Sequence, residues 1–259
     1  MKNTPYLLLS LLTILLHAAP TRSFAENPNI YYYFEDNNDP TMPTNSYQGL
    51  SNIKYEGDTH QTTEQFKFGK GSMVVSEKLN PKGNNIGGFT GSSQDLEGDI
   101  HKMTITAWVR PADSKQFTLL SRLPASAAGS FSLVYSHSYK TFFFAITKSD
   151  GTRKSYTSAP LPFFEPNEWL HVALTFDEGK IVFYVNGLPI KDADATADGI
   201  TTIPTPQGKQ TLLGFSDSRP GTYVDDFGLF TDHALTEQEM DKVFNKGLEE
   251  FVKNSAPKK

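Results

Sequence analysis

The chain has 259 residues, of which 20% are charged and 12% are aromatic, and its net charge is −5. This mildly acidic balance excludes the strongly basic footprint of a protein that binds nucleic acid or an anionic membrane surface. Cysteine is absent, which excludes disulfides, and a β domain of this length can bury a sufficient core without them.

The first 25 residues have the pattern of a secretory signal peptide. Lys2 supplies a positive start, residues 7–16 form an apolar run, and Ser23 and Ala25 are small residues suited to cleavage. The run is shorter than the about 20 apolar residues of a membrane span, and no later segment approaches that length. We therefore expect residues 1–25 to be removed and the product to be secreted, to a periplasm or to the extracellular space. A buried N-terminal helix is the alternative.

Segments with strand character recur at intervals of roughly ten residues through the rest of the chain. They combine β-branched or aromatic residues with a period of two, and they lie at residues 31–34, 72–75, 103–109, 117–122, 131–135, 142–148, 169–176, 181–186, 211–215 and 223–230. Turn-forming residues predict loops at 36–49, 79–98 and 192–197. This pattern favours an antiparallel β-sandwich formed by one domain, residues 26–259.

The clearest pair of strands lies at residues 168–187, EWLHVALTFDEGKIVFYVNG. Within it, residues 169–176 and 181–186 alternate between two faces, both of which carry apolar side chains. Asn186 and Gly187 form a second turn, because both residue types tolerate the positive φ of a tight hairpin. We expect an antiparallel meander at the centre of a sheet.

One helix is predicted, at about residues 236–253. Thr236 and Glu239 have the spacing of a capping box, in which the hydroxyl and the carboxylate each accept a bond from an early backbone N–H. Apolar residues with helical spacing follow, and Gly247 is expected to end or kink the helix. We expect the apolar face to dock on the sandwich rather than to bind a partner.

Four segments carry a family resemblance. They are FGKGS at residues 68–72, MTITAWVRP at 103–111, WLHVALTFD with IVFYVNG at 169–187, and GTYVDDFGLF at 221–230. In this order they resemble the turn, early strand, central hairpin and last strand of laminin G-like and pentraxin-like jelly rolls, in the concanavalin A-like lectin and glucanase superfamily. The resemblance implies an all-β, two-sheet antiparallel jelly-roll sandwich with a short C-terminal α-helix.

Two adjacent carboxylates interrupt the last predicted strand. Simple alternation places Asp225 on one face with Phe227 and Leu229, where a carboxylate must be paired, hydrogen-bonded or metal-bound. The resemblance implies a structural calcium ion here, and calcium takes six to eight oxygen ligands. The candidate metal ligands are Asp225, Asp226, Glu35 and Asp36. The alternative is that Asp225 accepts hydrogen bonds from the closing loop or from the start of the helix.

Two loops combine aromatic rings with hydrogen-bonding side chains, as a sugar-binding site requires. One contains residues 136–139, and the other contains residues 216–219 before the last strand. The candidate ligand-binding residues are His137, Tyr139, Asp217, Arg219 and Tyr223. Ordinary solvated turns are the alternative, because loops are polar in most proteins.

Trp108, Trp169 and His171 lie inside strand patterns. We interpret the two tryptophans as packed residues rather than as sugar platforms. His171 is interpreted in the same way, as a packed strand histidine rather than as a catalytic base.

No catalytic residue is assigned. Glycoside hydrolysis needs two carboxylates about 5 to 10 Å apart. The nearest match to the glucanase pattern E-x-D-x-x-E is Glu97, Asp99 and Lys102, with lysine in place of the last glutamate.

Three functions are therefore considered. The first is non-catalytic binding of extracellular or cell-wall carbohydrate. The second is a protein-binding, scaffold or adhesion role with an extracellular protein as the partner. The third, disfavoured by the broken motif, is a glycan-active hydrolase or lyase. The fold alone does not choose among them, and the oligomeric state stays open.

Overall fold

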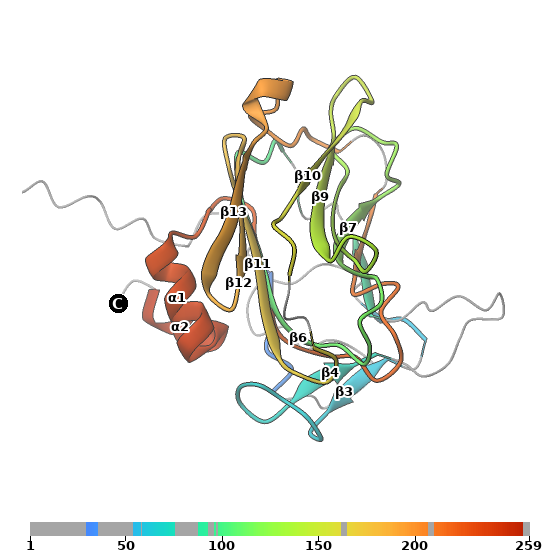
Figure 1. Cartoon of the computed structure of the whole chain (residues 1–259), viewed down its shortest axis with the longest axis vertical. Coiled ribbons are helices and arrows are strands. Elements are labelled where there is room, and N and C mark those ends of the chain that lie inside the picture. The colour runs from blue at the N-terminus through green and yellow to red at the C-terminus, as the bar shows by residue number, and fades with distance from the viewer. Residues whose placement is uncertain are drawn as a thin grey trace, which may run out of the picture.

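The described part of the chain forms two antiparallel sheets packed face to face, with two helices outside one of them (Figure 1). The computed structural model describes residues 30–35, 54–57, 59–75, 88–92, 96, 98–161, 165–206 and 210–255. The predicted signal peptide, residues 1–25, and the candidate ligand Asp36 lie outside these ranges. The architecture is the jelly-roll sandwich that the sequence predicts.

Both sheets consist of antiparallel pairings. The first runs in the order β13-β12-β11-β6-β15-β4-β3, with β1 paired to β15. Its strands are β1 (Ile30–Tyr32), β3 (His60–Thr62), β4 (Ser72–Val74), β6 (Lys102–Arg110), β11 (Leu170–Asp177), β12 (Lys180–Val185), β13 (Leu188–Asp194) and β15 (Tyr223–Phe230). The second runs in the order β10-β9-β8-β7-β14-β5-β2. Its strands are β2 (Lys54–Tyr55), β5 (Phe89–Ser92), β7 (Phe117–Leu123), β8 (Phe131–Ser136), β9 (Thr141–Thr147), β10 (Arg153–Thr157) and β14 (Thr211–Gly214).

The predicted central hairpin is confirmed. β11 and β12 pair from Val172 with Val185 to Asp177 with Lys180, and β11 pairs along its whole length with β6. Asn186 has φ 50° at the following turn, the left-handed conformation that asparagine tolerates. β6 lies between β11 and β15 and therefore links the meander to the last strand of the chain.

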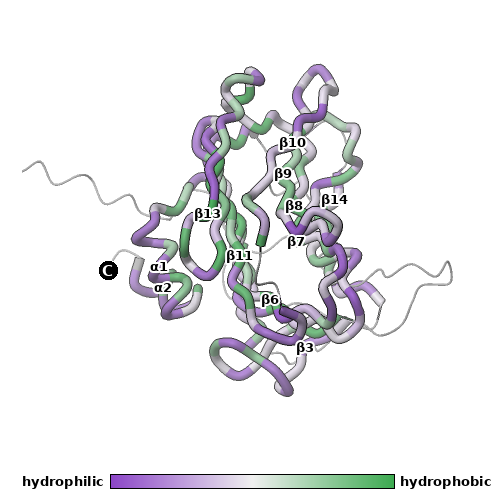
Figure 2. Tube along the Cα trace, viewed as in Figure 1, coloured by the Kyte–Doolittle hydropathy of each residue, from purple (hydrophilic) through white to green (hydrophobic). Residues whose placement is uncertain are grey.

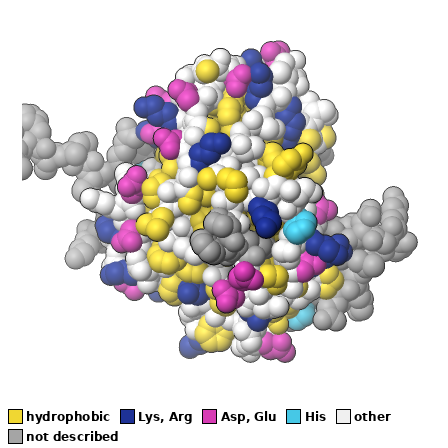
Figure 3. Space-filling model, viewed as in Figure 1, with side chains coloured by type: hydrophobic (Ala, Val, Ile, Leu, Met, Phe, Trp, Pro, Cys, Tyr) yellow, Lys and Arg dark blue, Asp and Glu magenta, His cyan; other side chains and the backbone are white. Residues whose placement is uncertain are grey.

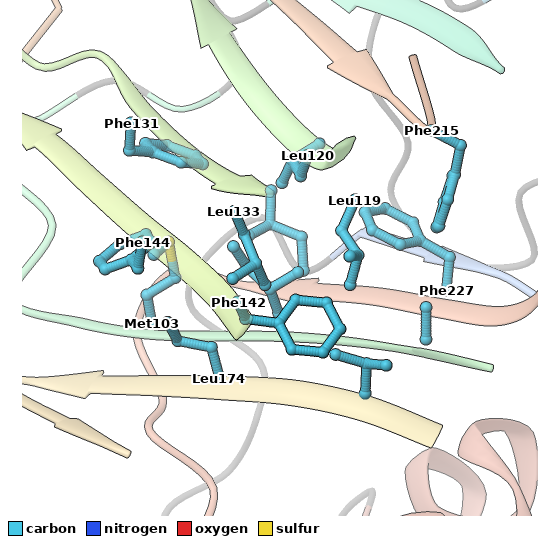
Figure 4. Close-up of a cluster of buried hydrophobic side chains, with 14 of the residues drawn as sticks. Met103, Leu119, Leu120, Phe131, Leu133, Phe142, Phe144, Leu174, Phe215 and Phe227 are labelled. Carbon is cyan, nitrogen blue, oxygen red and sulfur yellow. The ribbon is translucent and has the colours of Figure 1, made fainter. Parts of the chain in front are cut away.

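The core lies between the sheets and is built from the inward side chains of each strand. Met103 and Leu174 of the first sheet face Leu133, Phe142 and Phe144 of the second (Figure 4). Apolar residues concentrate in the strand centres and polar residues in the turns (Figure 2). Full burial of one such side chain contributes about 1.5–3 kcal/mol to the stability of the fold. Packing of these side chains therefore holds the strands in place, and the strand ends determine where the connecting loops begin and end.

Two helices, α1 (Glu237–Lys246) and α2 (Leu248–Ser255), cover the outer face of the first sheet (Figure 1). The capping box is present, because Thr236 and Glu239 bond each other's backbone N–H groups. A second buried cluster joins the helices to the sheet and includes Tyr31, Ala173, Tyr184, Phe230, Met240, Val243, Leu248 and Phe251. The predicted single helix is divided at Gly247, where φ is 80°.

The last strand, β15, departs from the predicted alternation. Its pairing with β6 shifts between Asp225 and Gly228, and Asp226 has φ 47°. A bulge of this kind changes which face the neighbouring side chains occupy. The core residues of this strand are Val224, Phe227 and Leu229. The expectation that Asp225 shares their face was therefore wrong.

Some strands lie where the sequence predicts loops or no regular structure. β5 falls within residues 79–98, β2 and β3 have no clear strand pattern, and β13 extends to Asp194. β13 is an edge strand with mostly exposed residues, so apolar alternation is missing from it. Among the described residues, no helix has the length and hydrophobicity of a membrane span.

Candidate functional site

The two loops that carry the candidate ligand-binding residues lie at the same end of the sandwich. One connects β8 to β9, and the other connects β14 to β15. Thr118, near the start of β7, lies between them, because its backbone pairs with β8 and its hydroxyl donates to Asp217 Oδ2 at 3.4 Å. We define the loop-end surface as His137, Tyr139, Asp217, Arg219 and Tyr223.

Tyr139 is the most prominent group on the loop-end surface, with 70% of its surface exposed. Its ring meets that of Phe143 edge to face, with centroids 5.8 Å apart. The Lys140 N–H donates to the His137 carbonyl at 3.2 Å and closes the turn, which holds Tyr139 near its tip. A ring supported in this way loses little conformational entropy when a ligand stacks on it.

The other part of the loop-end surface is charged. Asp217 and Arg219 are exposed, and Arg219 Nε lies 3.6 Å from Asp113 Oδ2. Tyr223 is half-buried, and the Arg110 guanidinium lies over its ring at 5.4 Å. Arg110 therefore already covers one face of the Tyr223 ring, whereas most of the Tyr139 ring is exposed to solvent.

The two adjacent carboxylates of β15 lie in a different place, beneath the helices. Asp225 Oδ2 accepts from the N–H groups of Lys67 at 2.7 Å and Phe68 at 3.0 Å, and its Oδ1 accepts from the Asp226 N–H at 2.8 Å. These donors belong mainly to the β3–β4 turn rather than to the closing loop. The helix start bonds Asp226 instead, through the Leu248 N–H at 2.7 Å.

Burial raises the pKa of both carboxyl groups. The pKa of Asp226 rises to about 7, because burial and the charges of Glu35 and Glu249 outweigh the Leu248 N–H bond. The pKa of Asp225 lies well above its ordinary range because of burial and the Asp226 charge, which its three N–H bonds oppose. Two adjacent buried carboxyls do not both ionise readily, so we expect the pair to retain a proton near neutral pH.

Calcium binding stays a prediction. Glu35 accepts from the Lys70 N–H at 2.6 Å, and both oxygens of Asp225 face N–H donors. Within the part of the chain that the structure describes, no three His, Asp or Glu side chains lie close enough together to hold a metal ion. These residues do not by themselves supply the oxygen shell of calcium, and Asp36 is outside the described ranges.

Melting in excess calcium and in excess chelator tests this prediction. A structural calcium ion binds only the folded state, so we expect calcium to raise the melting temperature by about 2–4 °C for each kcal/mol of linked binding energy. Equal melting temperatures in the two conditions would remove calcium as a ligand.

His171 is fully buried, which confirms its interpretation as a packed strand residue. Its Nε2 lies 2.8 Å from Thr106 Oγ1, and its ring contacts those of Trp108 and Phe244 at 5.3 and 5.7 Å. Burial lowers the pKa of His171 to about 3. Trp108 is also packed, at 3% exposed, whereas Trp169 is only half-buried.

A pocket that the sequence does not predict lies beside Asp226, with a volume of about 310 Å³. Its lining combines Glu35, the β3–β4 turn at Phe68 and Gly69, the β15 bulge and the residues around Gly247. These segments are far apart along the chain. No local pattern therefore indicates the pocket, apart from the two glycines at turns.

Charged side chains do not separate by sign on the face drawn in Figure 3, where basic and acidic groups are interspersed. Opposite charges also form close pairs in the described part of the chain, among them Lys102 with Asp177 at 2.9 Å and Lys154 with Asp198 at 2.7 Å. This face therefore lacks the basic stripe of a nucleic-acid-binding protein.

A family model described as the Concanavalin A-like lectin/glucanases superfamily matches residues 84–240. The chain belongs to this superfamily. The match extends from β5 into α1 and includes the central hairpin, which confirms the resemblance noted in the sequence. Comparison of this concanavalin A-like chain with curated protein sequences gave no match.

Solved structures of the binding domains of toxins have a similar fold. The botulinum neurotoxin serotype G binding domain is 14% identical, with a TM-score of 0.61 over 83% of this chain and 50% of that one. The binding domain of Paraclostridial Mosquitocidal Protein 1 is 11% identical, with a TM-score of 0.62 over 84% and 52%. A third structure comes from work on botulinum neurotoxin type C, whose cell entry is dependent upon interaction with two ganglioside molecules. It is 15% identical, with a TM-score of 0.58 over 84% of this chain and 51% of that one. This superfamily member spans about half the length of these structures. At these identities the likeness shows the fold alone.

Proposed function

We propose that the chain is a secreted, non-catalytic module that binds extracellular or cell-wall carbohydrate through the loop-end surface. The observation that carries the proposal is the exposed Tyr139 ring, supported by Phe143 at the end of the sandwich that also bears Asp217 and Arg219. The C–H faces of sugar rings pack on aromatic rings, and nearby polar groups bind the hydroxyls. The signal-like pattern of residues 1–25 supports secretion.

The fold relatives support a binding role. Two are binding domains of toxins, and the botulinum neurotoxin type C structure concerns entry that depends on gangliosides, which are glycolipids. A fold hosts many functions, so this support concerns the scaffold and not the particular ligand.

Tyr139→Ala is expected to reduce carbohydrate affinity at least about tenfold without unfolding the protein. Truncation of a binding hot spot costs about 2 kcal/mol or more, and each 1.4 kcal/mol corresponds to about a factor of ten. A glycan-array screen of the purified protein would identify the best carbohydrate, and calorimetric titration would compare the variants. The matched control is Leu188→Ala, because Leu188 is 68% exposed but lies at the start of β13. The proposal would be contradicted if the protein bound no glycan, or if Tyr139→Ala bound the glycan as tightly as the wild type does.

Protein binding is the second candidate, and the exposed Leu188 favours it. This residue borders a groove of about 460 Å³ between the β12–β13 turn and α1, together with Pro189, Glu237 and Asp241. An apolar side chain beside a groove rimmed by charges is typical of a protein contact. Leu188→Ala should therefore weaken capture of a protein partner while leaving carbohydrate binding intact, which separates the two candidates.

A further inference from the structure

We propose that the pocket beside Asp226 binds a primary ammonium or guanidinium group, carried by a small amine or by a lysine or arginine side chain of a protein. The pocket has a volume of about 310 Å³ and lies between the β3–β4 turn and the start of α2. It shares no residue with the loop-end surface, so this inference is independent of carbohydrate binding.

The Asp226 carboxylate is the group that points to a ligand. It lines the pocket, yet Asp226 is only 3% exposed. The Leu248 N–H donates to Oδ2 at 2.7 Å, and within the described part of the chain Oδ1 accepts no hydrogen bond and no lysine or arginine pairs with the carboxylate. A buried carboxylate without an opposite charge is costly, and an entering cation would supply that charge.

The charge of the lining favours a cation. Four carboxylates, those of Glu35, Asp226, Glu249 and Glu250, face two ammonium groups, those of Lys246 and Lys253. Both lysines already form ion pairs along α1 and α2, Lys246 with Glu250 at 3.2 Å and Lys253 with Glu249. The lining therefore has a net negative charge.

Two glycines allow the carboxylates to approach the backbone. A Cβ atom at Gly69 would lie 1.5 Å from Glu35 Oε1, and one at Gly247 would lie 2.8 Å from Asp226 Oδ2 and 3.0 Å from Phe68 Cγ. Both glycines have positive φ, which other residues rarely adopt. Phe68 forms an aromatic wall, and a cation close to such a ring gains further attraction. In this arrangement an alkyl stem packs on Phe68 while its charged end reaches Asp226.

The dimensions favour an organic cation over a bare metal ion. A water molecule occupies about 30 Å³ of liquid, so a pocket of about 310 Å³ accommodates several times that volume. The carboxylates are spread along its wall, and the described residues form no close group of three that could hold a metal. Ammonium and guanidinium groups instead make charge-assisted hydrogen bonds to single carboxylates.

Calorimetric titration of the purified protein with n-butylammonium, n-butylguanidinium and calcium chloride tests the proposal. We expect both organic cations to bind, and Asp226→Asn to lower their affinity about tenfold or more. Asparagine keeps an acceptor for the Leu248 N–H but carries no charge. Glu249→Gln, on the surface of α2, is a second variant expected to weaken binding. Asp150→Asn is the matched control, because Asp150 is an exposed carboxylate in the β9–β10 turn.

Peptides distinguish the two sources of the cation. Binding of a lysine-containing peptide that is lost on lysine acetylation would support a protein side chain, whereas binding of the free amines alone would support a small amine. The proposal would be overturned if calcium alone gave heat, or if neither organic cation gave heat at millimolar concentration. Equal affinity of the wild type, Asp226→Asn and Glu249→Gln for the organic cations would also overturn it. Circular dichroism of each variant establishes that a lost affinity does not reflect unfolding.

Discussion

Asp226→Asn is expected to be more stable than the wild-type protein at pH 8, by about 4 kcal/mol, and about equally stable near pH 4. The reason is the raised pKa of Asp226, about 7 in the folded protein because of burial. An unfolded aspartate has a pKa of about 3.9, so the folded state holds this proton more tightly. The stability that the proton supplies is complete below about pH 4 and is lost as the pH rises through about 7.

The substitution is suited to this test because it preserves the local structure. The asparagine oxygen can accept the Leu248 N–H, and asparagine tolerates the φ of 47° at this position. Urea unfolding between pH 4 and 8 measures the effect. A lower unfolding free energy for Asp226→Asn than for the wild type at pH 8 would show that the charge of Asp226 stabilises the fold.

Asp225→Asn is the matched comparison, because the gain from removing a buried charge is opposed there by the loss of a hydrogen-bond acceptor. Asp225 accepts three backbone N–H groups on two oxygens, and the amide nitrogen of asparagine would face one of these donors. A buried donor left unsatisfied costs about 1–3 kcal/mol, so this variant should be less stable at pH 8 than Asp226→Asn. Two neighbouring isosteric substitutions would then separate the effect of burying charge from the effect of losing hydrogen bonds.

His171→Phe is expected to remove an acid-induced loss of stability. Burial, with a smaller effect of the Lys67 charge, lowers the pKa of His171 to about 3, whereas an unfolded histidine has a pKa of about 6.5. The unfolded state therefore gains a proton first, and the stability present above about pH 6.5 is lost as the pH falls toward 3. One proton corresponds to about 1.4 kcal/mol for each pH unit, so this loss reaches about 2–3 kcal/mol at pH 4.5.

Phenylalanine retains an aromatic ring between Trp108 and Phe244 but leaves the Thr106 hydroxyl without its partner. We therefore expect His171→Phe to be about 1 kcal/mol less stable than the wild type at pH 7.5 and to gain stability relative to the wild type as the pH falls toward 4.5. Thr106→Val is the control, because it removes the same hydrogen bond and keeps the histidine. The pH profile of Thr106→Val should run parallel to that of the wild type; a parallel profile for His171→Phe would assign the acid sensitivity to another group.

Asp226 and His171 act in opposite directions over the same pH range. Lowering the pH from 7 to 4 stabilises the fold through the first group and destabilises it through the second. The wild-type profile is therefore expected to be shallower than that of either variant, and only the pair of substitutions reveals both contributions.

Asp226 also links stability to the proposed cation pocket. Asp226→Asn should raise stability at pH 8 and lower affinity for an organic cation. Residues that bind ligands often lower the stability of the unliganded protein, because a buried charge is compensated only when its partner is bound.

The strands and the helix start could be predicted because their signals are local. Alternating residues in β11 and β12 and the capping box at Thr236 act through neighbours a few positions away. β2 and β5 could not be predicted in this way, because they pair with each other and β5 with β14, across long stretches of sequence.

The candidate site was predictable residue by residue but not as a surface. Turn composition indicates that Tyr139, Asp217 and Arg219 lie in loops, and the structure shows all three exposed. Their common location depends on β7 lying between β8 and β14, which no local pattern encodes.

The sequence by itself determined the fold class, the central hairpin and the capped helix start, because hydrophobic period and capping chemistry operate within a turn or a strand. The tertiary structure decided the bulge at Asp226, the break at Gly247 and the pocket between them. Asp225 meets the Lys67 N–H across 158 positions of sequence, and the Asp226 carboxylate meets the start of α2. Buried polar groups must find hydrogen-bond partners wherever the packed strands bring them, and that requirement exists only once the sheets and helices have come together.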